Sequence, residues 1–140
     1  NIELKPNKGS EEANVVAVTE LIMKHKFDCQ YFLSSFDWFS VIKIRKLLPE
    51  SYVGILIDSV DQENNITKIL SKCNEHNFFS CGFNITIISD EIIKLCKNCG
   101  ILVTVYSSQN IEKNEAEKLW DLGVDSIFTN NPTPYKNMLK

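Results

Sequence analysis

The chain has 140 residues, 44% hydrophobic and 24% charged, which is enough for one domain with a core and too little for two ordinary ones. Its net charge of -3 and pI near 5.4 argue against a nucleic-acid-binding protein, which needs a basic face. No apolar run approaches the roughly 20 residues of a membrane span. Five scattered cysteines suit a reducing compartment, so we expect a cytoplasmic protein.

The first six residues, NIELKP, are predicted to form a strand with Glu3 and Lys5 on one face and Ile2 and Leu4 on the other. A strand buried on both faces is nearly all apolar, so two inward charges indicate a metal ion, a bound anion or water. The alternative is a solvent-facing ion pair on a frayed terminal strand, which is worth little. Because the chain starts inside this strand, without an initiator Met, we interpret it as a fragment.

Helices and strands are predicted to alternate along the rest of the chain. Helical spacing and capping residues predict five helices, at 10–27, 37–49, 66–73, 89–100 and 116–123, and a turn or short helix at 132–140. Short apolar runs predict five further strands, at 31–36, 52–58, 82–88, 101–106 and 124–129. Asp37 and Ser89 are the expected N-caps, and Gly100 and Gly123 the expected ends, of three of these helices.

Six strands and five helices in strict alternation predict a parallel sheet, either open and doubly wound or part of a (β/α)8 TIM barrel. No GxGxxG or GxxxxGK[ST] loop follows a strand, which weakens a nucleotide-binding function. Polar side chains instead gather at the carboxyl ends of the strands, where barrel active sites lie: Glu3, Lys5, Ser34, Ser35, Asp58, Tyr106, Ser107, Thr129 and Asn130.

Four motifs carry a resemblance to the glycerophosphodiester phosphodiesterase family. They occur in the family's order: NIELKP at 1–6, SSFD at 34–37, GILVTVY at 100–106 and LGVDSIFTNNP at 122–132. The resemblance implies a partial TIM (β/α)8 barrel whose six βα units correspond to strands three to eight. Residues 1–140 would then be a single domain, the C-terminal part of a glycerophosphodiester phosphodiesterase domain.

This resemblance implies a metal-dependent phosphodiester hydrolase of lipid and glycerol metabolism that converts glycerophosphodiesters to glycerol 3-phosphate and an alcohol. It implies Glu3 as a ligand of Mg²⁺ or Ca²⁺, Lys5 near the substrate phosphate, and Phe36 and Tyr106 as substrate-binding side chains. Carboxylate oxygens suit a hard cation, and a lysine offsets charge on a phosphate oxygen. Tyr106 stands where the family usually has Trp.

The resemblance also implies that important groups precede residue 1. The family's His-Arg-Gly motif, its Glu-x-Asp metal ligands and its second His lie on strands one and two. His25 and His76 fall near helix C-termini, so we expect no catalytic residue in this chain and an inactive isolated chain. Exposed sheet edges further predict self-association or a need for the missing N-terminal segment.

Other interpretations stay open. The chain could be a catalytically degenerate barrel relative that serves as a binding or assembly module. It could instead be a doubly wound domain that binds a phosphate-containing ligand, which requires a strand order that reverses within the sheet. Core packing is favoured over redox or zinc chemistry for Cys96 and Cys99 and over function for Trp38 and Trp120, and a loop-capping role is favoured over metal ligation for Asp58.

Overall fold

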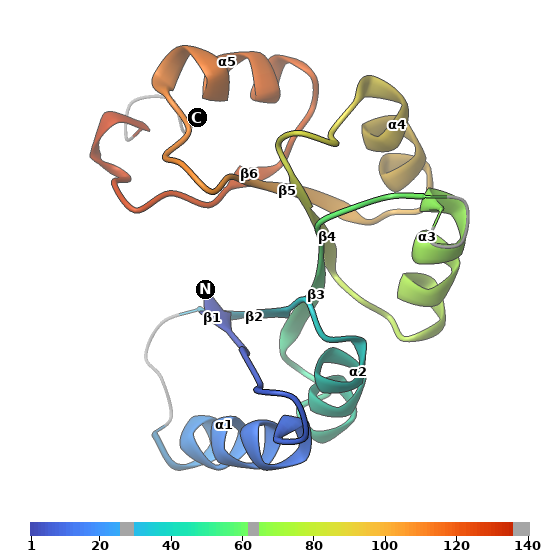
Figure 1. Cartoon of the computed structure of the whole chain (residues 1–140), viewed down its shortest axis with the longest axis vertical. Coiled ribbons are helices and arrows are strands. Elements are labelled where there is room, and N and C mark those ends of the chain that lie inside the picture. The colour runs from blue at the N-terminus through green and yellow to red at the C-terminus, as the bar shows by residue number, and fades with distance from the viewer. Residues whose placement is uncertain (26–29, 62–64, 136–140) are drawn as a thin grey trace.

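A computed structural model describes residues 1–25, 30–61 and 65–135. Within these residues, six parallel strands form one sheet in the order β1-β2-β3-β4-β5-β6. The strands curve in an arc, and the helices cover its outer side (Figure 1). This sequential order confirms the predicted partial (β/α)8 barrel. It also rules out the doubly wound domain, whose strand order would reverse.

The elements alternate as the sequence predicts. The strands are β1 (Ile2–Glu3), β2 (Phe32–Ser35), β3 (Tyr52–Ile57), β4 (Ser80–Asn84), β5 (Leu102–Tyr106) and β6 (Ser126–Ile127). The helices are α1 (Glu11–His25), α2 (Trp38–Leu47), α3 (Ile66–Glu75), α4 (Asp90–Asn98) and α5 (Lys113–Asp121), followed by the 3-10 turn η1 (Thr133–Tyr135). The predicted end of the first helix near residue 27 and residues 136–140 lie outside the described residues.

Local signals in the sequence set the helix ends. The Asp37 carboxylate accepts a hydrogen bond from the third N–H of α2 at 2.7 Å, and the Ser89 hydroxyl accepts one from the third N–H of α4 at 3.3 Å. Gly100 and Gly123, just beyond α4 and α5, have φ of +70° and +99°. These left-handed conformations favour glycine, so the predicted caps and ends are confirmed.

The sheet has two different faces. Its outer face packs against the helices through branched apolar side chains that are almost completely buried, among them Leu33, Val53, Ile55, Val103 and Val105. Its inner face carries small residues that pair laterally between neighbouring strands: Ser34, Gly54, Ser80, Gly82, Thr104 and Ser126. The apolar core therefore lies between the sheet and the helices, and small residues line much of the inner face.

Two glycines on the inner face make room for larger neighbours. A Cβ atom on Gly54 would lie 2.8 Å from the Phe32 ring and 2.4 Å from the Ser80 hydroxyl. A Cβ atom on Gly82 would lie 2.5 Å from a methyl of Leu56. Side chains of real residues do not approach so closely, so Phe32 and Leu56 lie across positions where their neighbours have no side chain.

Three strand predictions need correction. The strand predicted at 82–88 runs from Ser80 to Asn84, because the Asn84 side-chain oxygen accepts hydrogen bonds from the N–H and hydroxyl of Thr86 and turns the chain. The strands predicted at 1–6 and 124–129 are only two residues long. These two form the edges of the described sheet, where a strand has a neighbour on one side.

The fourth helix also differs from its predicted packing. Cys96 is buried as expected, but Cys99 is the C-cap of α4 and is exposed, so its predicted core position is wrong. Ile93 is the buried partner of Cys96 on this helix. Trp38 is partly buried and stacks on Phe78, with a ring-centroid distance of 6.0 Å.

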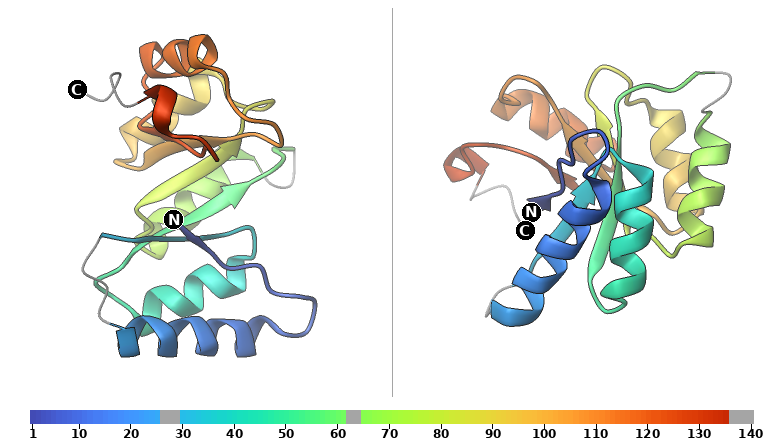
Figure 2. Two further views of the ribbon diagram at one scale, coloured as in Figure 1. Left: turned by 90° about the vertical axis from the view of Figure 1, so that its left-hand side faces the viewer. Right: turned by 60° about the horizontal axis from the view of Figure 1, so that its bottom comes forward.

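Seen from two further directions, the arc keeps one open side, with the N-terminus at its edge (Figure 2). Within the described residues β1 pairs only with β2, and β6 only with β5.

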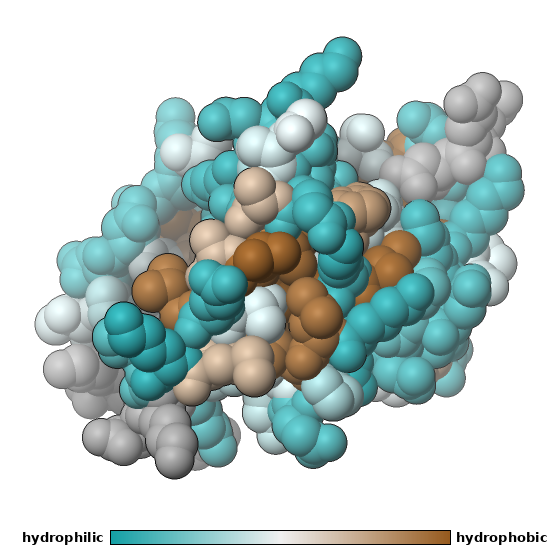
Figure 3. All heavy atoms as spheres, turned by 90° about the horizontal axis from the view of Figure 1, so that it is seen from below, coloured by the Kyte–Doolittle hydropathy of each residue, from teal (hydrophilic) through white to brown (hydrophobic). Residues whose placement is uncertain are grey.

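The face on the side of α1 and α2 carries apolar side chains among hydrophilic ones (Figure 3), and the exposed apolar residues of these helices include Leu21, Met23 and Phe39. None of the described helices has the length and apolarity needed to cross a membrane.

Alanine substitution of the two inner glycines should destabilise the fold by different amounts, because one glycine has a rigid neighbour and the other a flexible one. Gly54→Ala should destabilise the fold by about 1–3 kcal/mol, because the new methyl also meets the Ser80 carbonyl at 2.8 Å, which is backbone. Gly82→Ala should cost less than about 1 kcal/mol, because only the end of Leu56 has to move. Urea unfolding followed by Trp fluorescence measures both, and equal losses would contradict this account.

Candidate functional site

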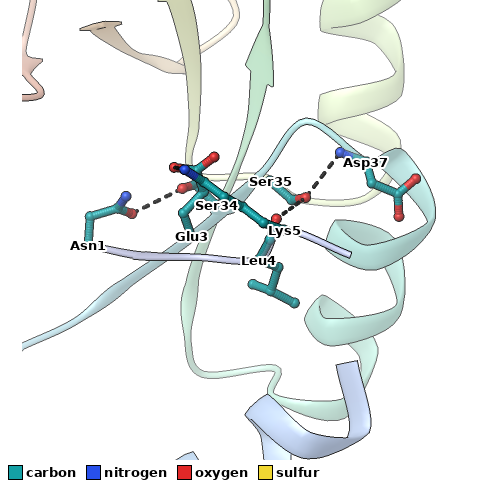
Figure 4. Close-up of polar contacts among 7 residues, drawn as sticks. All are labelled: Asn1, Glu3, Leu4, Lys5, Ser34, Ser35 and Asp37. Carbon is teal, nitrogen blue, oxygen red and sulfur yellow. Dashed lines mark hydrogen bonds and ion pairs between the residues drawn. The ribbon is translucent and has the colours of Figure 1, made fainter. Parts of the chain in front are cut away.

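The site begins at the first strand. The Glu3 and Lys5 side chains lie on the same side of the chain, and the Glu3 carboxylate is 3.4 Å from the Lys5 ammonium (Figure 4). Leu4, between them, is buried in the core on the opposite side. The Glu3 side chain is 24% exposed and that of Lys5 75%. The predicted alternation is therefore confirmed, and the ion pair of the alternative interpretation exists as well.

Two buried serines fasten this segment to β2. The Ser35 hydroxyl donates to the Leu4 carbonyl at 2.7 Å and accepts from the Asp37 N–H at 3.0 Å. The Leu4 N–H donates to the Ser34 carbonyl at 2.7 Å, and the Ser34 hydroxyl donates to the Asn1 side chain at 3.1 Å. Figure 4 shows this chain of contacts running from the first residue to the start of α2. Ser34 and Ser35 thus hold the strand that carries Glu3.

A recess of about 570 Å³ lies at the carboxyl ends of the strands. All four predicted site residues line it: Glu3, Lys5, Phe36 and Tyr106. They come from the ends of β1, β2 and β5, so residues more than 100 positions apart in the chain meet in one place. The other polar side chains that line it are uncharged and belong to Asn1, Ser107, Ser108, Gln109, Asn110, Thr129 and Asn130.

Two aromatic rings form a corner of this recess. The ring of Phe36 meets the ring of Tyr106 edge to face, with centroids 5.4 Å apart and an interplanar angle of 90°. This is a favoured geometry for aromatic pairs. Phe36 is 44% exposed, which leaves its ring available to a ligand.

Tyr106 is held from behind the recess. Its hydroxyl donates to the Ile57 carbonyl at 2.9 Å and to the Asp58 carboxylate at 3.1 Å. Burial, followed by the hydrogen bond to Asp58, raises the pKa of the Tyr106 phenol well above its usual value. Asn84 donates to the same Asp58 oxygen at 3.1 Å. The sequence predicts Asp58 at the end of a strand and Asn84 inside a strand, but no pattern in it predicts the contact between Asp58 and Tyr106.

The far side of the recess is built by two loops. The Thr129 hydroxyl, after β6, donates to the side-chain oxygen of Asn110 at 2.9 Å, which ties this loop to the one that follows β5. The Asn131 N–H donates back to the Thr129 hydroxyl at 3.1 Å. This wall offers amide and hydroxyl groups and no charge.

The described residues fit a cation only in part. Glu3 places one carboxylate in the recess, a suitable ligand for a hard cation. Across residues 1–25, 30–61 and 65–135, no three or more His, Cys, Asp or Glu side chains gather into a metal-binding cluster. His25 ends α1 and His76 caps α3, and neither lines the recess, as the sequence predicts. Among the described residues that line the recess, Glu3 is therefore the one carboxylate.

These features define first a class of protein: a parallel βα barrel with an acidic and a basic side chain at the carboxyl ends of its strands, where barrel enzymes hold their active sites. The model of the Glycerophosphoryl diester phosphodiesterase family matches residues 1–133. The chain belongs to this family, as its motifs predict.

Individual relatives agree with this assignment. A glycerophosphodiester phosphodiesterase from Caldanaerobacter subterraneus is 25% identical over 145 residues, which cover 100% of this chain and 55% of that protein. A phosphodiesterase from Oleispira antarctica, solved with the product sn-glycerol-3-phosphate, has TM-score 0.83 at 22% identity, over 98% of this chain and 53% of that one. A glycerophosphodiester phosphodiesterase from Parabacteroides distasonis has TM-score 0.74 at 17% identity, over 98% and 54%. The chain thus spans about half the length of these proteins.

Removal of the Ser35 hydroxyl should loosen the strand that carries Glu3. Ser35→Ala leaves the Leu4 carbonyl and the Asp37 N–H without their partner in a buried place, so we expect a loss of about 1–3 kcal/mol in unfolding free energy. The Leu4 amide should also exchange its hydrogen faster. Ser59→Ala, an exposed position just after β3, is the matched control, and a similar result for both variants would refute the role of Ser35.

Proposed function

We propose that this chain is the C-terminal part of a glycerophosphodiester phosphodiesterase. The reaction adds water to the phosphorus and breaks the bond to the alcohol oxygen, which yields glycerol 3-phosphate and the free alcohol. The observation that carries the proposal is the meeting of Glu3, Lys5, Phe36 and Tyr106 in one recess at the rim of a barrel of this family. The product in the Oleispira antarctica structure is consistent with it.

Glu3 and Lys5 are proposed to act on the phosphate. Glu3 would be one ligand of a divalent cation, Mg²⁺ or Ca²⁺, which when bound offsets the negative charge of the phosphodiester. With the Glu3 carboxylate engaged in this way, the Lys5 ammonium is free to leave its partner and pair with a non-bridging phosphate oxygen. The high exposure of the Lys5 side chain gives it the freedom for that movement.

The other walls are proposed to bind the rest of the substrate. The perpendicular rings of Phe36 and Tyr106 offer apolar contact to carbon atoms beside the phosphate. The uncharged amide and hydroxyl groups after β5 and β6 can hydrogen-bond to substrate hydroxyls. None of these groups forms or breaks a bond, so they orient the substrate.

We propose that the general acid and base, and the remaining cation ligands, come from two βα units outside this chain. No histidine of the described residues lines the recess, and a single carboxylate is too few ligands for a hard cation, which takes about six or more. A protein that contains this chain together with those units is called the complete barrel below.

Glu3→Gln should abolish most activity in the complete barrel. Loss of one cation ligand should lower kcat/KM for glycerophosphocholine by about 100-fold or more and raise the concentration of Mg²⁺ or Ca²⁺ needed for half-maximal rate. Lys5→Ala should lower the rate without changing that cation requirement. Glu20→Gln, at an exposed position on α1, is the control and should behave as the parent. A complete barrel that binds glycerol 3-phosphate but hydrolyses no glycerophosphodiester would identify the degenerate binding module instead.

The isolated 140-residue chain should be inactive and should self-associate. In the described sheet, the edge strands β1 and β6 each have a neighbouring strand on one side only, so their other sides can pair with a second copy. Light scattering should detect oligomers or aggregates, and assays with glycerophosphocholine and either cation should show no release of glycerol 3-phosphate. A monodisperse monomer would argue against the open-edge account, and hydrolysis by this chain alone would overturn the proposed need for added βα units.

A further inference from the structure

Asp58 and Asn84 have no part in the function proposed above, yet they lie beside the candidate site. Asp58 follows β3, Asn84 ends β4, and Tyr106 ends β5. These three strands are neighbours in the sheet, and Asn84 pairs directly with Tyr106 in the register of β4 and β5. The three side chains therefore lie next to one another at the carboxyl ends of these strands.

The Asp58 carboxylate is the centre of this group. Its Oδ1 atom accepts a hydrogen bond from the Tyr106 hydroxyl and another from the Asn84 amide, both at 3.1 Å. The Tyr106 hydroxyl also lies 2.9 Å from the Ile57 carbonyl, so its single proton is shared between two acceptors at the end of β3. A carboxylate acceptor makes stronger hydrogen bonds than a neutral one, which favours this arrangement.

The orientation of Asn84 is fixed on its other side. Its side-chain oxygen accepts from the Thr86 N–H at 3.1 Å and from the Thr86 hydroxyl at 3.0 Å. The amide oxygen is thereby occupied, and the NH₂ group is left to face Asp58. The Ile85 N–H, which donates to the Tyr106 carbonyl at 2.8 Å, joins the same turn to β5.

The Tyr106 hydroxyl stays a donor under ordinary conditions. Burial of the phenol and its hydrogen bond to Asp58 both raise its pKa, so the neutral form is favoured at all moderate pH values. The Tyr106 hydroxyl therefore keeps the proton that it donates to Asp58.

The consequence appears on the other side of the ring. Tyr106 lines the recess and meets Phe36 at a right angle, whereas Asp58 and Asn84 do not belong to the described residues that line it. Asp58 accepts from the hydroxyl end of Tyr106, Asn84 donates to Asp58, and Tyr106 itself lines the recess. Without Asp58 the Tyr106 hydroxyl keeps only its bond to the Ile57 carbonyl, so the ring has more freedom to rotate about its side-chain bonds and to change the width of the recess.

We propose that Asp58 and Asn84 are positioning residues that fix the Tyr106 ring as a wall of the substrate recess. The proposal rests on the function proposed above. Neither residue touches the substrate, and their effect reaches it through Tyr106. A ring that contacts the substrate equally in the ground state and the transition state changes KM and leaves kcat nearly unchanged.

The kinetic test uses the complete barrel with four substitutions. Asp58→Leu and Tyr106→Phe should each raise KM for glycerophosphocholine by about 3- to 10-fold, which corresponds to the loss of one aromatic contact with the substrate. In both variants kcat should stay within about twofold of the parent value. Asp58→Asn should stay close to the parent, because its side-chain oxygen still accepts both hydrogen bonds. Asp121→Leu, an exposed position at the end of α5, controls for loss of a surface charge. An unchanged KM in Asp58→Leu, or an Asp58→Asn variant as impaired as Asp58→Leu, would overturn the proposal.

A second measurement needs no activity. The perpendicular Tyr106 ring should shift the NMR signals of the Phe36 ring protons, assigned by comparison with Phe36→Leu. This shift should collapse in Asp58→Leu and persist in Asp58→Asn and Asp121→Leu. If no protein hydrolyses the substrate but the shift collapses as expected, the positioning role stands and the proposed function fails. If hydrolysis occurs but the shift persists in Asp58→Leu, only the positioning role fails.

Discussion

The hydroxyl of Ser35 is the contact on which the candidate site depends most. It joins three parts of the chain at one buried atom: the Leu4 carbonyl of the first segment, the end of β2, and the N–H of Asp37, the N-cap of α2. Because β1 has only two residues, few ladder hydrogen bonds hold it, and the acid and base on either side of Leu4 would otherwise sit on a loose end. A single side chain thus converts a short edge strand into a defined support for Glu3 and Lys5.

The fold was readable from the sequence because its signals are local and repeated. Alternation predicted the first strand, short apolar runs predicted the other five, and caps such as Asp37 and Ser89 predicted helix starts. The errors lie where a second local signal competes with the apolar pattern. Residues 85–88 are rich in isoleucine and suit a strand, but the Asn84 side chain bonds to Thr86 and ends the strand early. At α4, the apolar stripe continues in sequence to Cys99, but the helix stops there.

The candidate site was predictable in its residues and not in its geometry. Motif resemblance selected Glu3, Lys5, Phe36 and Tyr106, and the sheet order then brings them together. The contact of Asp58 with Tyr106 joins positions 48 apart through the curvature of three strands, and no local pattern encodes it. Its only sequence signal was a polar residue directly after a buried strand, which is equally typical of an ordinary loop.

The small residues of the inner face have an evolutionary consequence. Because Phe32 lies over Gly54 and Leu56 over Gly82, the volume of this layer is shared between neighbouring strands. A larger residue at one position then requires a smaller one on the adjacent strand, so substitutions here should be tolerated in compensating pairs. Such paired substitutions would change the sequence of this layer and leave the width of the concave side unchanged.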